Sequence, residues 1–214
     1  SGPWPAPAKL NLMLRVIGRR ADGYHELQTV FQIIDRSDAL YYRVRSDRLV
    51  TREGGPEGVP EAQDLAVRAA LLLQKHSGCG QGVDIRINKR LPLGGGLGGG
   101  SSDAATTLMV LNRLWELGLG DDELARLGLS LGADVPVFVR GHSAWAEGVG
   151  EHLQPLVLTE PWYLVLIPPC HVSTASVFVA DELTRNSPRI TISDFLAGDA
   201  VNDCLPVVQK NTLR

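Results

Sequence analysis

Glycine is concentrated at one point of the chain, in a pattern that could bind phosphate. Of the 23 glycines, six fall within the seven residues Gly94–Gly100. Glycine loses more backbone freedom on folding than other residues, about 0.5–1 kcal/mol relative to alanine, so a plain surface loop does not need so many. Without Cβ atoms, successive N–H groups can converge on a phosphate, and a following helix N-terminus adds partial positive charge. The cluster therefore predicts a phosphate-binding loop rather than a flexible linker.

Two well-known phosphate loops fit this segment poorly. A Walker loop needs a lysine directly after its last glycine, where this chain has Ser101. Gly94, Gly96 and Gly99 satisfy the Gly-x-Gly-x-x-Gly pattern, but six clustered glycines do so almost by chance. A dinucleotide-binding fold would place that pattern after a fully buried parallel strand, whereas apolar and polar residues alternate over 83–88. A dinucleotide-binding dehydrogenase is therefore the less favoured interpretation.

Two charged residues lie in apolar surroundings, where they could serve a reaction. Asp134 lies between Ala133 and Val135, and an unpaired carboxylate there would be costly. Lys9 follows Ala8 in a segment with the alternation of a strand. From these residues alone, a structural ion pair is the more common explanation of either one.

Hydrophobic periodicity predicts the elements that position these residues. Apolar patterns indicate strands at 10–14, 27–34, 39–45, 83–88, 135–139, 144–146 and 163–167. Helical spacing indicates helices over 61–75, stopped by Gly78, and over 121–129, capped by Asp121 or Asp122. A third helix follows the glycine loop, with Ser101 or Ser102 as N-cap and Gly118 as its end. Without regular βα alternation, this order favours an α+β fold over a doubly wound sheet.

Composition excludes several classes of protein. At 214 residues, 44% hydrophobic and 21% charged, the chain is typical of a globular protein with one large or two small domains. With 21 basic and 24 acidic side chains, a net charge of −3, it lacks the basic excess of a general nucleic-acid binder. Its three cysteines are far apart, which indicates a reducing compartment and no zinc site.

One uncharged stretch, 161–180, approaches the length of a membrane span. Pro161, Pro168 and Pro169 interrupt it, and its second half is polar. We therefore expect a buried strand at 163–167 that runs into a functional loop. With no secretory signal in the sequence, we expect a cytoplasmic protein.

Four longer motifs carry a family resemblance. Pro92–Ser102 (PLGGGLGGGSS) resembles the ATP-binding motif of the GHMP kinases, the family of galacto-, homoserine, mevalonate and phosphomevalonate kinases. Three further segments are similar to one branch of that family: Pro7–Leu12 (PAKLNL), Gly18–Thr29 (GRRADGYHELQT) and Leu131–Pro136 (LGADVP). The match runs from about Pro7 to Cys204, too long and specific for chance agreement.

The resemblance implies a two-domain α+β fold. Residues 1–155 would form an N-terminal ATP-binding domain of the ribosomal-protein-S5 domain 2 type, and residues 156–214 would begin a smaller C-terminal α/β domain. The family has a third glycine loop later in the chain, beside the nucleotide phosphates, and none occurs before Arg214. We therefore expect an incomplete C-terminal domain in these 214 residues, with weak stability and little turnover.

The resemblance also implies an activity. It would be transfer of the γ-phosphate of ATP, with Mg²⁺, to the 2-hydroxyl of a cytidine-diphosphate-linked methylerythritol, in the non-mevalonate route to isoprenoid precursors. The partners would be small molecules, without nucleic acid or membrane. Two alternatives are another GHMP kinase acting on a different alcohol and a nucleotide-binding module without catalysis. Lys9 and Asp134, both present, argue against the module.

The resemblance assigns roles to individual residues. Asp134 would be the catalytic base, and Lys9 its cationic partner, which also stabilises charge on the transferring phosphoryl group. Tyr24 would stack on the cytosine, His25 would hydrogen-bond its edge, and Phe178 would cover the opposite face. From sequence alone, the first two could equally be turn residues, and Phe178 a core residue.

Further binding residues follow from the same motifs. Asn11 and Thr174 would make polar contacts to the substrate, although the segment 172–178 departs from the family pattern at Ser173, Ala175 and Ser176. The ATP-binding residues would be Pro92, Leu93, Gly94, Gly95, Gly96, Leu97, Gly98, Gly99, Gly100, Ser101 and Ser102. Either serine could contact Mg²⁺, and N-capping of the helix would explain them equally well.

Overall fold

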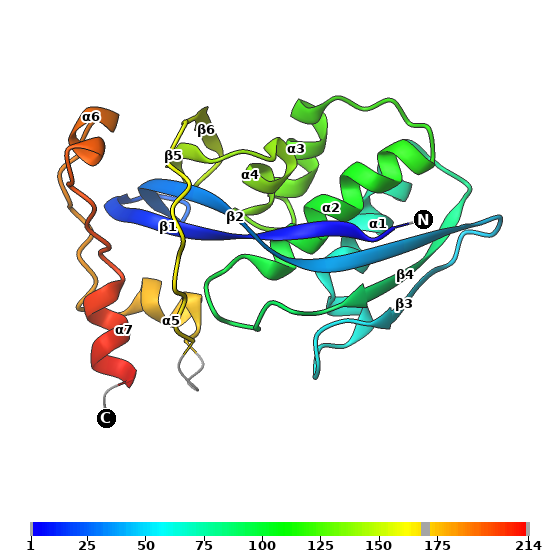
Figure 1. The fold of residues 1–214 in the computed structure, drawn as a ribbon, viewed down its shortest axis with the longest axis horizontal. Coiled ribbons are helices and arrows are strands. Elements are labelled where there is room, and N and C mark those ends of the chain that lie inside the picture. The colour runs from blue at the N-terminus through cyan, green and yellow to red at the C-terminus, as the bar shows by residue number, and fades with distance from the viewer. Residues whose placement is uncertain (1, 168–171, 213–214) are drawn as a thin grey trace. The chain divides into compact units, whose positions relative to one another are not determined.

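The computed structural model describes residues 2–167 and 172–212, and it contains two compact units built from interleaved segments (Figure 1). Unit 1 comprises Ser1–Lys9, Ile33–Leu93 and Leu97–Gly141, and unit 2 comprises Leu10–Gln32, Gly94–Gly96 and His142–Arg214. The two long strands β1 (Trp4–Arg19) and β2 (His25–Arg45) pair with each other, and each contributes residues to both units. The domain boundary expected at residue 155 stays a prediction, because these units are not contiguous in sequence.

Most strands of unit 1 lie where the alternation of apolar and polar residues predicts them. The second half of β2 runs antiparallel to β4 (Gly82–Asn88), from Ala39 opposite Asn88 to Arg45 opposite Gly82. β3 (Val50–Gly54) runs parallel to β4 and was not predicted. The buried side chains of β4 are Val83, Ile85 and Ile87, which confirms its half-exposed character. The predicted strands 27–34 and 39–45 are one continuous strand, β2.

Helix α1 (Leu65–Ser77) begins later than expected because Asp64 caps it. The Asp64 carboxylate accepts hydrogen bonds from the backbone N–H groups of Ala66 and Val67, which satisfies two donors of the first turn. The three residues before it form a short 3-10 turn, η1 (Glu61–Gln63). Gly78 ends the helix in the left-handed conformation, as predicted.

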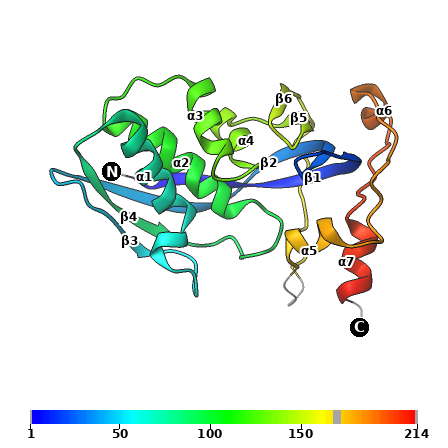
Figure 2. The same cartoon turned by 180° about the vertical axis from the view of Figure 1, so that it is seen from behind.

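Three further helices pack in unit 1, and each differs from expectation in one respect. They are α2 (Gly99–Leu114), α3 (Asp121–Leu129) and α4 (Val135–Arg140), and Figure 2 shows α2 side by side with α1. The N-cap of α2 is Gly98 rather than a serine, and that of α3 is Gly120 rather than an aspartate. The predicted strand at 135–139 is wrong. Those residues form α4, because a continuous buried apolar run has no alternation to separate strand from helix.

In unit 2, the first half of β2 pairs antiparallel with β5 (Ala144–Gly148), and β5 pairs with β6 (His152–Pro155). Three helices complete the unit: α5 (Thr174–Val179), α6 (Ile192–Leu196) and α7 (Leu205–Thr212). One apolar cluster joins Met13, Val30, Trp145 and Phe195. A second cluster joins Val16 to α5 and α7, which lie side by side in Figures 1 and 2. The antiparallel pairs of β2 with β4, β2 with β5 and β5 with β6, together with helices grouped in blocks, confirm an α+β fold.

The second half of β1 is covered along one edge by a segment from far along the chain. Leu14 forms an isolated parallel bridge with Asn202. The backbone N–H of Val16 donates to the carboxylate of Asp203 at 2.7 Å, and the hydroxyl of Ser187 donates to the same oxygen at 2.6 Å. Asp203 is 8% exposed, so these hydrogen bonds are shielded from water. The first and last parts of the described chain are therefore bonded together within unit 2.

The buried strand expected at 163–167 is wrong. The segment has no regular secondary structure, and the side chains of Trp162, Leu164 and Leu166 are 100%, 87% and 80% exposed. An apolar composition favours burial but does not supply a partner strand, and no strand of the described residues pairs with this segment. The expected functional loop falls partly on residues 168–171, which lie outside the described residues. Within the described part of the chain, no helix is long and apolar enough to span a bilayer.

Candidate active site

Lys9 and Asp134 form an ion pair in unit 1. Lys9 lies in β1 and Asp134 precedes α4, and the Lys9 Nζ is 3.2 Å from the Asp134 Oδ2. The lysine side chain is 6% exposed and the aspartate side chain 33% exposed. The carboxylate therefore has one face on a buried ammonium and another face open to an incoming group. A carboxylate in this position can accept a proton from such a group.

The end of the glycine loop packs directly on Lys9. The backbone N–H of Lys9 donates to the carbonyl of Leu97 at 3.0 Å. Gly98 has φ +72°, and a Cβ there would lie 2.8 Å from the Phe138 ring and 3.2 Å from the Lys9 Cε. Only glycine allows the backbone to come this close to the lysine side chain. The end of the loop, from Leu97 on, and the ion pair of Lys9 and Asp134 therefore form one local site within unit 1.

Helix α2 presents free backbone donors at this site. Its first intrahelical hydrogen bond runs from the N–H of Ser102 to the carbonyl of Gly98, and no side chain caps the helix. The N–H groups of Gly99, Gly100 and Ser101 therefore have no partner within the helix. Together with the helix dipole of a 16-residue helix, these groups fit a phosphate.

The two serines of the loop differ in their surroundings. Ser102 is 0% exposed, and its Oγ has no hydrogen-bond partner among the described residues, whereas Ser101 is half-buried. A buried hydroxyl without a partner is costly, and an Mg²⁺–phosphate group would satisfy it. No group of three or more His, Cys, Asp or Glu side chains that could hold a metal ion occurs within residues 2–167 and 172–212.

Sequence analysis missed a buried charge cluster at the base of the loop. Lys89 Nζ donates to a carboxylate oxygen of Asp38 at 2.5 Å and of Asp103 at 2.8 Å. The other oxygen of Asp38 accepts the backbone N–H groups of Arg90 and Leu91. No spacing rule relates Asp38 to Asp103, since they meet only because β2 and α2 pack together.

Burial and the neighbouring charges both shift the pKa values of Asp103 and Lys89 in this cluster. Burial raises the pKa of Asp103 to about 7, against the lowering effect of Lys89. Burial lowers the pKa of Lys89, but its two carboxylates outweigh that effect and the net pKa is raised. One oxygen of Asp103 has no partner among the described residues. Asp38 accepts three donors, the Lys89 ammonium and the backbone N–H groups of Arg90 and Leu91.

Unit 2 holds the predicted cytosine-binding residues His25 and Phe178. Their ring centroids are 5.3 Å apart at an interplanar angle of 32°. Arg185, which sequence analysis missed, donates from its Nε to the His25 Nε2 at 3.2 Å, and from its guanidinium to the carbonyl of Phe178 at 3.0 Å. Burial, and then the charge of Arg185, lowers the pKa of His25. The imidazole is therefore neutral at pH 7 and carries its proton on Nδ1.

The other predicted substrate residues also lie in unit 2. Tyr24 follows the turn after β1 and is 64% exposed, and the described residues show no ring contact between Tyr24 and Phe178. The Asn11 side chain donates to the Thr29 hydroxyl at 2.8 Å. Thr174 is the exposed first residue of α5. The roles assigned to these residues stay predictions.

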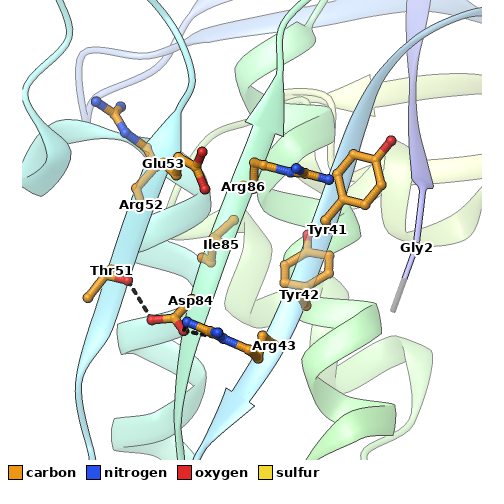
Figure 3. Close-up of a pocket in the computed structure, with 10 residues that line it drawn as sticks. All are labelled: Gly2, Tyr41, Tyr42, Arg43, Thr51, Arg52, Glu53, Asp84, Ile85 and Arg86. Atoms are coloured by element: carbon orange, nitrogen blue, oxygen red, sulfur yellow. Dashed lines mark hydrogen bonds and ion pairs between the residues drawn. The ribbon is translucent and has the colours of Figure 1, made fainter.

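A separate hollow of about 600 Å³ lies on the open face of β2, β3 and β4 in unit 1 (Figure 3). Its polar side chains bind one another. Arg43 and Thr51 both hydrogen-bond to Asp84, and the Arg86 guanidinium lies 4.2 Å from the centre of the Tyr41 ring. None of the predicted site residues lines this hollow. It is therefore a different surface from the candidate active site.

Two curated relatives of this chain carry the same enzyme name. Residues 64–142 match the N-terminal domain of the GHMP kinases. Over 206 residues the chain is 61% identical to 4-diphosphocytidyl-2-C-methyl-D-erythritol kinase of Nitrosococcus oceani, covering 96% of this chain and 74% of that protein. It is equally identical to the enzyme of that name from Alkalilimnicola ehrlichii, covering 96% of this chain and 71% of that protein.

Solved structures give the same picture of the fold. A crystal structure of 4-(cytidine 5'-diphospho)-2C-methyl-D-erythritol kinase superposes with a TM-score of 0.80 at 34% identity, over 99% of this chain and 78% of that one. The homoserine kinase of Cytophaga hutchinsonii superposes with a TM-score of 0.58 at 17% identity, over 89% of this chain and 61% of that one. The second likeness concerns the fold alone.

Proposed function

The chain belongs to the 4-diphosphocytidyl-2-C-methyl-D-erythritol kinases, a branch of the GHMP kinases, and we propose that it transfers the γ-phosphate of ATP to the 2-hydroxyl of 4-diphosphocytidyl-2-C-methyl-D-erythritol. The product would feed the non-mevalonate route to isoprenoid precursors. The single observation that carries this proposal is the ion pair of Lys9 and Asp134 against the end of the glycine loop. It combines a base, a cation and the backbone N–H groups at the start of α2 within unit 1.

Each part of this site has a role in the proposed reaction. Asp134 accepts the proton of the substrate hydroxyl as that oxygen forms its bond to the γ-phosphorus, and the bond from phosphorus to the ADP oxygen breaks. Lys9 orients the carboxylate through their ion pair and offsets the charge that develops on the transferring phosphoryl group. The N–H groups at the start of α2 bind the phosphates. Phosphoryl transfer depends mainly on such positioning and electrostatics.

Ser102, and Ser101 beside it, would contact Mg²⁺ bound to the nucleotide. The ion supplies positive charge that offsets charge on the phosphate oxygens. The Ser102 hydroxyl, which lacks a partner among the described residues, would be one ligand of such an ion.

Unit 2 offers groups suited to a pyrimidine ring. Phe178 supplies an apolar face, and the neutral His25 supplies an Nδ1–H donor while Arg185 occupies its Nε2. Arg185 also bonds to the carbonyls of Phe178 and Ala180, so it holds the phenyl ring's segment and the imidazole together. A base ring can stack on Phe178 and hydrogen-bond to His25 at the same time.

We expect Phe178→Ala to weaken binding of the cytidine-diphosphate substrate but not binding of ATP. Base–aromatic stacking is worth roughly 1–3 kcal/mol per base, which is about a 5- to 150-fold rise in KM for that substrate. The KM for ATP should change less than about twofold, because the nucleotide phosphates bind elsewhere. Steady-state kinetics in both substrates measure the difference. Val179→Ala on the exposed side of the same helix is the matched control, and equal losses for both substrates would make Phe178 a packing residue.

A coupled ADP-release assay tests the proposed activity directly. The purified protein should release ADP from Mg-ATP only when the cytidine-diphosphate-linked alcohol is present. Homoserine, mevalonate and galactose in place of that alcohol test for another GHMP kinase. ATP binding without ADP release on any of these alcohols would indicate a non-catalytic nucleotide-binding module and contradict the proposal.

A further inference from the structure

The glycine loop is held at both of its ends by one buried charge cluster, formed by Lys89, Asp38 and Asp103. We propose that these three are positioning residues for ATP: they fix the entry and the exit of the loop and so pre-form its phosphate-binding conformation. This inference rests on the proposed function of the loop. None of the three touches the reacting atoms in the proposed chemistry.

The entry of the loop is fixed by Asp38. This side chain lies in β2 and is fully buried. Its Oδ1 accepts the backbone N–H groups of Arg90 at 2.5 Å and Leu91 at 2.9 Å. Two consecutive amides on one carboxylate oxygen set the direction in which the chain leaves β4 toward the glycines. Leu91 is itself 4% exposed, so the anchored turn is also packed.

The exit of the loop is fixed by Asp103. This residue lies in the first turns of α2 and is 3% exposed. The Lys89 ammonium donates both to Asp103 and to Asp38, at 2.8 Å and 2.5 Å. One side chain therefore connects the strand before the loop with the helix after it. The distance that the intervening residues must span is fixed before any ligand binds.

Gly99 makes room for this connection. A Cβ on Gly99 would lie 3.3 Å from the Lys89 Nζ and 3.5 Å from the Asp38 Oδ2. It would also lie 3.3 Å from the Leu91 Cβ. At these distances a side chain would push the ammonium or the loop entry aside. The glycine at this position thus serves the charge cluster beneath the loop, in addition to the phosphate side.

The energetic reason for such a cluster is preorganisation. A glycine-rich segment has many conformations, and ordering it on binding would reduce affinity for the nucleotide. A buried group of one ammonium and two carboxylates is expensive to desolvate, and apolar packing would stabilise the fold as well. The cluster's distinctive contribution is geometric, because its directional hydrogen bonds fix the positions of the two loop ends relative to each other.

The test is ATP binding by Lys89→Met, compared with wild type by calorimetry. We expect the dissociation constant for ATP to rise about 10- to 100-fold, because the loop must be ordered on binding. In activity measurements, the KM for ATP should rise in the variant. Its kcat at saturating ATP should stay within about threefold of the wild-type value. Amide hydrogen exchange of the 90–101 region should be faster in the variant without any ligand. Tyr42→Phe is the matched control, because it removes a buried hydrogen bond to Thr107 of α2 and leaves both loop ends intact.

Conservative variants keep the test decisive where Lys89→Met does not fold. Asp103→Asn retains an oxygen for the Lys89 ammonium and should bind ATP within about threefold of wild type, whereas Asp103→Ala should not. A folded Lys89→Met protein with unchanged ATP affinity and loop exchange would overturn the inference, as would equal affinities of the two Asp103 variants. Wild-type protein that fails to bind ATP would instead refute the proposed function. The ligand-free exchange comparison would still report whether Lys89 anchors the loop.

Discussion

Asp134→Asn is expected to lower kcat by about 10²–10⁴-fold, the usual contribution of a positioned general base, while both substrates still bind. The amide keeps the size and position of the carboxylate beside the Lys9 ammonium but cannot accept the hydroxyl proton. Steady-state kinetics on a protein with an unchanged circular dichroism spectrum measure the effect. Asp122→Asn is the control, because Asp122 pairs with Arg140 of α4 on the protein surface. A folded Asp134→Asn enzyme with near-normal turnover would leave positioning alone as the mechanism.

Lys9→Ala should lower kcat as well, by roughly 10²–10³-fold, on the scale of a lost oxyanion-type donor. Because the ammonium and the carboxylate act as a unit, the double variant should be far less impaired than the product of the two single losses. Steady-state kinetics on the wild type, the two single variants and the double variant give the coupling free energy between Lys9 and Asp134. Strictly multiplicative losses would mean that the two side chains act independently, despite the 3.2 Å between them.

Gly98→Ala is expected to impair both stability and nucleotide use. The left-handed φ of +72° costs an alanine roughly 1–2 kcal/mol. The new Cβ would also lie 2.8 Å from the Phe138 ring and 3.2 Å from the Lys9 Cε, so the loop or the lysine must move. Since a displacement near 1 Å in a catalytic site can cost about 10²-fold, kcat/KM for ATP should fall at least that far.

A matched glycine separates the two causes. Gly118 has nearly the same φ, +69°, and a Cβ there meets nothing within 4 Å. Gly118→Ala should therefore lower the thermal unfolding temperature, because its backbone pays the same cost of a positive φ. It should leave kcat/KM for ATP unchanged. If Gly98→Ala behaved in the same way as Gly118→Ala, the close packing of the loop on Lys9 would have no functional role.

The sequence predicted the parts of this molecule that depend on local chemistry. The glycine cluster, its place between a strand and a helix, and the half-exposed strand at 83–88 all follow from residue types and spacing, and the structure confirms them. The family resemblance is also confirmed, and the pairing of Lys9 with Asp134 agrees with it. The α+β class followed from the order of the elements.

The remaining features depend on tertiary contacts that no local pattern encodes. The run at 135–139 reads as a strand because all of its residues are apolar, and only its packing within unit 1 makes it helical. The serines after the glycine loop are good caps in isolation, yet Gly98 takes the position because it can adopt a positive φ. Lys89 meets Asp38 and Asp103 only after β2, β4 and α2 have packed. Arg185 reaches His25 across 160 positions of sequence.

The hydrogen bonds between β1 and the segment around Asp203 also determine when unit 2 can form during synthesis. Val16 and the carboxylate that receives its N–H are 187 positions apart. At about 5–20 residues per second, a ribosome takes roughly 10–40 s to make that stretch. Unit 1 draws its last segment from residues up to Gly141 and can close earlier. Until Asp203 emerges, the apolar side chains of Met13 and Val16 lack part of their cover. These apolar side chains therefore stay partly uncovered for longer during synthesis than the core of unit 1.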